Sequence, residues 1–264
     1  MIQLPRICTR LFVSAALLSA VIGVQAAGLP DTGVDTCYND TVADGVAASN
    51  AGSIARDAGT HPRQDCRYGR DPATTAGAAK TGAGTKGLDY TKIAINGTVL
   101  AAGVALGSTA TDWACTRDNI TGLTWEVKTT SGLRSSASTY SWYSASATTN
   151  GGNVGLAATG SCSLGTGCDT EKFVTDVNAI ALCGYSDWRL PSRRELLTLL
   201  LMDGTSPAVD ATYFPNSVAS DYWSSSTNAA LTTGAWAVHF GTGISTAVTK
   251  STSSAVRLVR GTQF

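Results

Sequence analysis

The stretch 183–196, which reads Cys-Gly-Tyr-Ser-Asp-Trp-Arg-Leu-Pro-Ser-Arg-Arg-Glu-Leu, constrains the fold most, because it combines the end of one helix with the start of another. Gly184 is typical of the residue that follows a helix, since glycine enters the left-handed conformation at low cost. Pro191 keeps the residue before it extended. Ser192 and Glu195 have the spacing of a capping box, in which each side chain bonds a backbone N–H at a helix start. The stretch therefore predicts a fixed turn between two helices.

Apolar residues at helical spacing predict both helices. The first is expected to begin at Asp169 or Thr170 and to run to Cys183, and the second is expected over 193–202. Alternating apolar and polar residues predict short strands. The first two are expected at 92–95 and 98–100, joined by a type I′ turn at Asn96-Gly97. The others are expected at 123–127, 236–240, 244–248 and 256–260, and one more is expected to begin at residue 222. Hairpins around two helices indicate an α+β domain.

The start of the chain has the layout of an export signal. Arg6 and Arg10 precede an uncharged apolar run over 11–24, and small residues stand three and one positions before Ala27. This pattern predicts a cleaved signal peptide. The alternative is a membrane anchor, but the run is shorter than the roughly 18–20 residues that a spanning helix needs.

Three parts of the chain follow from this pattern. Residues 1–26 are expected to be the signal peptide, and no later segment is apolar enough to span a membrane. Residues 27–87 contain few large apolar side chains, so we expect a loop-rich segment tied down by a disulfide. The main domain is expected over 88–264.

The charge balance gives no reason to expect a nucleic-acid partner. The chain has 19 basic and 19 acidic side chains, and loss of Arg6 and Arg10 with the signal would leave a net charge of about −2. Only 14% of the residues are charged, against the usual quarter or so. Gly, Ala, Ser and Thr take their place, which suits an exported domain that is secreted, periplasmic or attached to the cell surface.

The cysteines predict a disulfide framework. Seven cysteines become six when Cys8 leaves with the signal, and an even number in an exported chain favours disulfides. Of the 15 pairings that six cysteines allow, we expect Cys37–Cys66, Cys115–Cys183 and Cys162–Cys168. The alternative, a zinc site, has little support, because the chain has no Cys-x-x-Cys spacing and its two histidines are His61 and His239.

Several cations and one aromatic group are the candidate ligand contacts. Arginine grips a sulfate or carboxylate through two N–H groups, and an aromatic face packs against the C–H face of a sugar. The candidates are Arg193, Arg194, Lys250, Arg257, Tyr140, Trp142 and Tyr143. The structural alternative is that the aromatic group fills the core and that the two adjacent arginines are solvated surface charges.

Other tryptophans are expected to be structural, and no catalytic residue is predicted. Trp125, Trp188, Trp223 and Trp236 are assigned to the core, and Arg189 is expected to pair with a buried carboxylate, either Glu126 or Glu195. The sequence shows no nucleophile elbow, no metal-spaced histidine pair and no carboxylate dyad.

Five motifs occur in a fixed order over most of the predicted domain: 118–126, 184–191 with Glu195-Leu196, Tyr213-Phe214-Pro215-Asn216, Tyr222-Trp223-Ser224-Ser225, and 256–261. In these motifs the chain resembles the C-terminal domain family of the bacterial collagen-like adhesin Lcl. The resemblance implies a C-type-lectin-like fold, also used by the formylglycine-generating enzyme, with two helices and a twisted antiparallel sheet. The namesake binds sulfated polysaccharides at the cell surface, but its collagen-like repeats are absent here.

The resemblance implies an exported, non-catalytic and adhesin-like module on a bacterial surface that recognises a glycan or a surface protein. Two alternatives remain: a self-assembling structural component of the surface, and an enzyme related to formylglycine-generating oxidases, which act through redox-active cysteines or copper-bound thiolates. No cofactor is expected. Calcium stays open at the loop carboxylates Asp169, Asp203, Asp210 and Asp221, which lack EF-hand spacing.

Overall fold

The computed structural model describes residues 31–32, 36–38, 43–47, 80–85, 87–163 and 165–263, and of 36–38 and 43–47 it describes the backbone alone. In the N-terminal part, β1 (Thr36–Tyr38) pairs antiparallel with β2 (Ala43–Ala47). The predicted signal peptide and the predicted Cys37–Cys66 disulfide lie outside what is described. No helix within the described ranges is long and apolar enough to cross a membrane.

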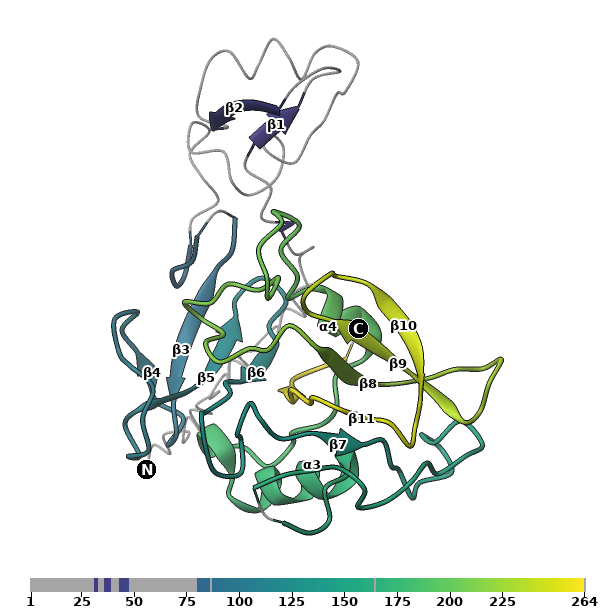
Figure 1. Cartoon of the computed structure of the whole chain (residues 1–264). Helices are drawn as coiled ribbons and strands as arrows, with labels where there is room; N and C mark the ends of the chain where they lie inside the picture. The colour runs from purple at the N-terminus through teal and green to yellow at the C-terminus, as the bar shows by residue number, and fades with distance from the viewer. Residues whose placement is uncertain are drawn as a thin grey trace, which may run out of the picture.

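A five-stranded antiparallel sheet forms one part of the main domain, with the strand order β12-β6-β5-β3-β4 (Figure 1). Its strands are β3 (Tyr90–Ala94), β4 (Val99–Leu100), β5 (Trp113–Asp118), β6 (Thr124–Glu126) and β12 (Val259–Arg260). The last strand of the chain therefore pairs with β6. This pairing joins the C-terminal strand to the N-terminal half of the domain.

The β3–β4 hairpin turns differently from the prediction. Of its two central residues only Gly97 has a positive φ, +89°, whereas a type I′ turn needs a positive φ at both. The N–H of Gly97 donates to the Ala94 carbonyl at 2.9 Å, and the N–H of Ala94 donates to the Thr98 carbonyl at 2.8 Å. The loop therefore has three residues and ends on a left-handed glycine, so the predicted type I′ turn is wrong although both strands are present.

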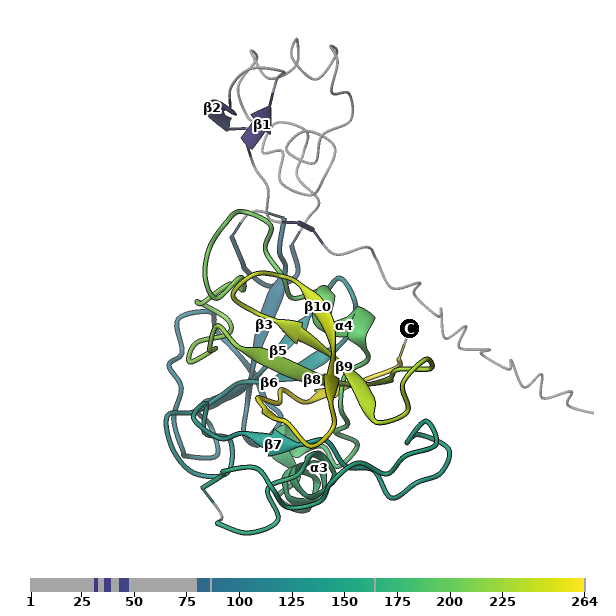
Figure 2. The same ribbon diagram turned by 45° about the vertical axis from the view of Figure 1, so that its right-hand side comes forward.

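A second, three-stranded sheet has the order β10-β9-β8. It consists of β8 (Asp221–Thr227), β9 (Gly234–His239) and β10 (Ser245–Thr249), all antiparallel. A short pair, β7 (Tyr140–Ser141) with β11 (Ser253–Ser254), lies near it, and in Figure 1 β11 runs between β8 and β7. Figure 2 shows the three-stranded sheet in front of the five-stranded sheet. These elements make the α+β architecture with antiparallel sheets that the sequence predicts.

The central turn forms as predicted, with both of its helix starts. α3 (Thr170–Ala179) begins after Asp169, whose side chain accepts from a backbone N–H of the first turn. α4 (Arg193–Leu197) begins with the complete capping box of Ser192 and Glu195. The two short polar side chains before these helices therefore fix where each one starts.

Both helices end earlier than predicted. The chain leaves α3 through Ala181, Cys183 and Gly184, whose φ angles of 47°, 55° and 78° cannot continue a right-handed helix. Residues 182–184 form the short 3₁₀ helix η1 (Leu182–Gly184) instead. After α4, the N–H of Leu201 donates to the Ala208 carbonyl at 2.8 Å. Tertiary pairing of this kind replaces the last predicted helical turn.

Two predicted disulfides are present. Cys115 of β5 is bonded to Cys183 of η1, and Cys162 is bonded to Cys168. The first bond links the five-stranded sheet to the central turn. The second closes the short loop that leads into the cap of α3.

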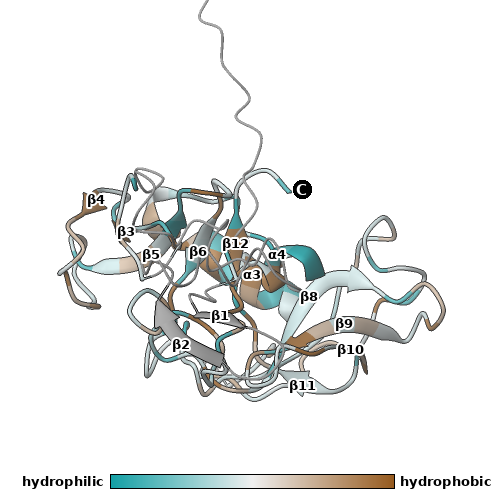
Figure 3. Cartoon of the chain, turned by 90° about the horizontal axis from the view of Figure 1, so that it is seen from above, coloured by the Kyte–Doolittle hydropathy of each residue, from teal (hydrophilic) through white to brown (hydrophobic). Residues whose placement is uncertain are grey.

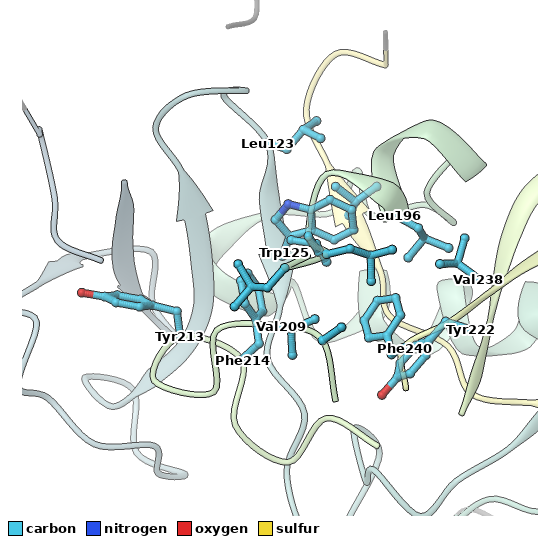
Figure 4. Packing of buried hydrophobic residues seen from close by; sticks show 14 of the residues in the cluster. Leu123, Trp125, Leu196, Val209, Tyr213, Phe214, Tyr222, Val238 and Phe240 are labelled. Atoms are coloured by element: carbon cyan, nitrogen blue, oxygen red, sulfur yellow. The ribbon is translucent and has the colours of Figure 1, made fainter. Parts of the chain in front are cut away.

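Buried residues of both sheets share the core. In Figure 4, Trp125 of β6 lies next to Leu196 of α4, and both belong to one cluster of buried side chains. Phe240 stacks on Tyr222 in the same cluster, with the ring centroids 4.0 Å apart. The helix with the capping box is therefore held by the apolar residues that follow its start.

Three of the four predicted core tryptophans are buried, and the fourth is not. Trp125, Trp188 and Trp223 are each at most 2% exposed. Trp236 is only half-buried, and the guanidinium of Arg193 lies 4.5 Å from its ring centroid. The assignment of Trp236 to the core is wrong, because one face of its indole is covered by a surface arginine instead of apolar side chains.

Candidate binding groove

A groove of about 560 Å³ runs beside α3 and the end of β8. Four segments far apart in the sequence line it, together with Gln263: residues 142–149 after β7, 170–174 in α3, 189–190 in the central turn and 225–227 of β8. Hydroxyl groups dominate this lining. The fold therefore gathers serines and threonines, which look unremarkable in the sequence, around two aromatic residues.

Tyr143 is the aromatic residue that the groove presents. It is half-buried and lines the groove. The Thr170 hydroxyl fixes its backbone on both sides, since it accepts from the Tyr143 N–H at 3.0 Å and donates to the Tyr143 carbonyl at 2.8 Å. Gly155 faces Tyr143 across an antiparallel bridge. The first residue of α3 therefore sets the position of this aromatic side chain.

Trp142 contributes to the groove wall but belongs mainly to the core. It is 1% exposed, and its indole N–H donates to the Ser224 carbonyl at 2.9 Å. The ammonium of Lys250 lies 4.2 Å from its ring centroid. Tyr140 is 2% exposed, and its ring stacks on Phe173. Of the three aromatic residues predicted as ligand contacts, Tyr143 is therefore accessible, whereas Tyr140 and Trp142 pack in the core.

The charges of the groove are already occupied by partners within the protein. Glu171 accepts from the Ala145 N–H at 2.7 Å. Arg189 donates to both carboxylate oxygens of Glu195, at 2.8 and 2.7 Å, and to the Gly261 carbonyl at 3.1 Å. Glu195 is therefore the carboxylate partner of Arg189, one of the two that were predicted. The groove is not a cationic site, because its arginine is neutralised by a buried carboxylate.

A smaller hollow of about 400 Å³ adjoins the groove and shares Ser226 and Thr227 with it. It contains Arg193, Arg194 and Trp236. Figure 3 shows the hydrophilic colour at α4, where the two arginines lie. Both arginines stay available as ligand contacts, with Arg194 exposed and Arg193 partly covered by its contact with the indole.

Two other predicted ligand contacts are buried, and this part of the prediction is wrong. Lys250 is 2% exposed, and its ammonium donates to the carbonyls of Asn150 and Asn153 at 2.7 and 2.6 Å. Arg257 is fully buried, and its guanidinium donates to the Glu126 carbonyl at 3.0 Å. Both cations hold distant loops and strands together, so neither reaches a ligand on the surface.

The sequence analysis missed a buried group of charges around Glu126. Lys128 lies 2.9 Å from the Glu126 carboxylate as an ion pair without hydrogen-bond alignment, and both side chains are almost fully buried. Arg134 and Arg257 add two more buried cations. Burial lowers the pKa of Lys128 to about 8, although the Glu126 carboxylate opposes this shift. Alternation along β6 predicts that Glu126 and Lys128 face solvent, and this part of the prediction is wrong, because every residue of 123–128 is buried.

Replacement of Lys128 by methionine tests this cluster. The lysine has a pKa of about 8 in the folded protein and an ordinary value of 10.5, so between these values the unfolded chain binds more protons. Wild-type stability should therefore gain roughly 2 kcal/mol from this residue between pH 8 and pH 10. In K128M the gain should vanish, as measured by urea unfolding across this range.

The matched control for K128M is Lys172→Met on the surface of α3, which pairs with Asp176 one turn away. K172M should keep the wild-type dependence on pH. Burial raises the pKa of Tyr90 and Tyr140, so these residues lower the free energy of unfolding as the pH rises toward their unfolded pKa and beyond. Their contribution is the same in wild type, K128M and K172M, so it cancels when the variants are compared. An equal pH dependence in wild type and K128M would contradict the assignment.

Three of the four candidate calcium carboxylates accept from neighbouring backbone N–H groups, and among them Asp203 accepts from Thr205 at 3.0 Å. Asp169 accepts from the N–H groups of Lys172 and Ala158, and Asp210 accepts from the Thr212 N–H. Within the described part of the chain, no three His, Cys, Asp or Glu side chains gather in a way that could hold a metal ion.

Comparison with known protein families matches residues 114–260 to the family model described as the Lcl C-terminal domain. The match runs from β5 to β12, so it includes the four chain segments that line the groove and both described disulfides. No curated protein matches the chain.

Proposed function

Because the family model covers more than half of it, the chain belongs to the Lcl C-terminal domain family, and we propose that it is a non-catalytic binding module whose groove takes a glycan. The family indicates a surface-associated module. The proposal adds an adhesin-like role, a C-type-lectin-like fold, and an exported protein that is secreted, periplasmic or attached to the surface of a bacterium. The observation that carries it is the groove that combines Tyr143 with many hydroxyl groups.

The chemistry of the groove supports a sugar ligand. Sugars offer a C–H face that packs on aromatic rings and hydroxyls that exchange hydrogen bonds with side chains. Tyr143 supplies the ring, and Ser225, Ser226 and Thr227 supply hydroxyls elsewhere in the lining. The volume of about 560 Å³ lies within the range of about 300–1,000 Å³ that is usual for small-ligand sites.

The charges of the groove favour an uncharged sugar over a sulfated one. The guanidinium of Arg189 is paired with Glu195, and the Glu171 carboxylate would repel a sulfate. Binding should therefore depend little on salt concentration, because salt mainly screens interactions between charges.

The disulfides support a non-catalytic role. Cys115, Cys183, Cys162 and Cys168 are bonded in two pairs. Formylglycine-generating oxidases work through reactive cysteines, and a bonded thiol is not available as a thiolate ligand or nucleophile. A count of free thiols in the denatured, unreduced protein tests this point, and two or more reactive thiols in the domain would contradict it.

Substitution of Tyr143 by alanine is the direct test of the groove. We expect a loss of affinity of about tenfold for the glycans that wild-type protein binds on an array of neutral and sulfated sugars, because stacking on one aromatic ring contributes up to about 1.5 kcal/mol. The measurement is titration at low and at high salt with the best sugar from the array.

Tyr185→Ala is the matched control, since Tyr185 is an exposed tyrosine outside the groove lining. Y185A should bind like wild type. If both variants bind like wild type, or if binding is confined to sulfated sugars and disappears at high salt, the groove is not the site. Binding to a partner protein without any sugar would likewise contradict the glycan assignment.

A further inference from the structure

β10 is the outer strand of the three-stranded sheet. Among the described strands it pairs with β9 alone, in a regular antiparallel register from Ser245 opposite Val238 to Thr249 opposite Gly234. Figure 1 shows β10 at the outer side of its sheet. Three of its five residues are exposed and the other two are half-buried. The strand therefore presents one edge of its backbone to the surroundings.

The register identifies the backbone groups at this edge. The His239 N–H donates to the Ile244 carbonyl at 2.8 Å, and the Lys250 N–H donates to the Thr233 carbonyl at 2.9 Å. Along an antiparallel strand, the backbone N–H and C=O groups of alternate residues point toward the neighbouring strand and away from it. Ile244 and Lys250 bond to β9 and its flanking residue, so Thr246 and Val248 do the same. The N–H and C=O groups of Ser245, Ala247 and Thr249 therefore point away from β9, and among them the Thr249 carbonyl accepts from the Thr252 N–H at 2.8 Å.

The features that usually protect an edge strand are missing from β10. Natural sheets block their edges with charged side chains, proline or a bulge. The sequence 241–249, Gly-Thr-Gly-Ile-Ser-Thr-Ala-Val-Thr, contains no charge and no proline, and the register with β9 is unbroken. The next residue, Lys250, turns its ammonium inward to two loop carbonyls. The lysine that could have protected this edge is therefore buried.

We propose that this edge pairs with the same edge of a second copy of the chain, in an antiparallel arrangement with Ala247 on the two-fold axis. In this register Ser245 of each copy lies opposite Thr249 of the other. All three outward-facing residues then lie opposite a residue of the other copy, and Ala247 exchanges both of its backbone hydrogen bonds with its equivalent. In each flanking pair the Thr249 N–H donates to the Ser245 carbonyl of the other copy, whereas the Thr249 carbonyl, which already accepts from the Thr252 N–H, has one lone pair left for Ser245. Any shift of the register leaves at least one of the three residues unpaired. The two three-stranded sheets become one six-stranded sheet.

The charge of the strand favours a second copy as the occupant. A two-fold axis places each side chain opposite an equivalent region of the partner, so a charged strand would meet its own charge. β10 has none, and it is therefore complementary to itself. The small side chain at Ala247 allows the two strands to approach, and hydroxyl side chains meet at the flanking positions.

This pairing would place the Trp236 and Arg193 surfaces of both copies on the same face of the dimer. Ala247 lies directly opposite Trp236 in β9, so the two side chains share a face of the sheet. A two-fold axis perpendicular to the sheet keeps that face common to both copies. The two Trp236 backbones would then be about 14 Å apart, three strand spacings, each beside its own Arg193.

Two opposite charges at position 247 test the proposal. Sedimentation velocity of the mature protein should show a dimer whose fraction rises with concentration. Ala247→Lys and Ala247→Glu should each weaken self-association at least tenfold, because equal charges then meet on the axis. An equimolar mixture of A247K and A247E should restore the dimer. Position 247 is exposed, so both variants should keep the wild-type circular dichroism spectrum and melting temperature.

Val99→Lys is the matched control, because Val99 is 65% exposed on β4, the edge of the other sheet. V99K should dimerise like wild type. The proposal is overturned if the wild-type protein stays monomeric up to millimolar concentration, if A247K dimerises like wild type, or if the mixture of the two variants stays monomeric. Open-ended assembly into fibres would also overturn it, since a two-fold pairing closes at the dimer.

Discussion

Loss of the Cys115–Cys183 disulfide is expected to lower the free energy of unfolding by about 4 kcal/mol, the largest effect predicted for this protein. The bond joins β5 to η1 across a sequence separation of 68 residues. A crosslink over so long a loop removes much conformational entropy from the unfolded chain. The double variant Cys115→Ala/Cys183→Ala, compared with wild type by chemical denaturation, measures this difference.

The second disulfide of the domain provides the matched control. Cys162 and Cys168 are separated by 6 residues, so the same entropy argument gives about 2 kcal/mol for Cys162→Ala/Cys168→Ala. Both double variants lose two cysteines and one disulfide, but the lost disulfides close loops of different length in the wild-type protein. An equal or larger cost for the short loop would contradict the entropy argument and point to local packing near α3 instead.

The sequence predicted the central turn well because its determinants are local. The capping box needs only Ser192 and Glu195 three positions apart, and the structure contains it in full. The pairing of Arg189 with Glu195 also joins close neighbours in the sequence. The Cys115–Cys183 disulfide was a long-range prediction, but it depended on a small number of cysteines and not on packing detail.

The burial of Lys250 and Arg257 could not be predicted, because their partners are distant and carry no pattern. Lys250 is held by the carbonyls of Asn150 and Asn153, which lie about a hundred residues earlier, and every residue has a carbonyl. A charged side chain is buried when such acceptors surround it. Sequence spacing gives no sign of them, so both cations looked like surface residues.

The groove was predicted only in part for the same reason. Sequence analysis selected Tyr143 because an aromatic cluster in a polar region is conspicuous. It did not select Thr170, Glu171 or Ser225–Thr227, since serine and threonine are abundant throughout the chain and become a site only where four segments meet. Trp236 was misassigned because alternation placed it on a strand face but did not show that Arg193 covers that face.

One carboxylate connects the central turn with the groove. Glu195 is fully buried; it closes the capping box by accepting from the Ser192 N–H at 2.7 Å, and it holds Arg189 at the groove wall. The same side chain therefore starts a helix and neutralises the only arginine that lines the groove in the described residues. Its loss should affect stability more than loss of any exposed charge nearby.

Glu195→Ala is expected to lower the free energy of unfolding by about 3 kcal/mol. The lost cap contributes about 1 kcal/mol, and the lost charged hydrogen bonds to Arg189 contribute about 2 kcal/mol. Glu195→Gln should cost less, because glutamine also closes a capping box. Urea unfolding of the two variants beside wild type measures both values.

Arg194→Ala, one position earlier on α4 and exposed, is the control and should change stability by less than about 0.5 kcal/mol. A double-mutant cycle with Arg189→Ala separates the ion pair from the cap. We expect a coupling of about 2 kcal/mol, the contribution of the charged hydrogen bonds. This value is below that of a fully buried pair, because Arg189 keeps 27% of its side chain exposed. Additive effects of E195A and R189A would show that Glu195 acts through the cap alone. A cost of E195A equal to that of R194A would contradict both roles.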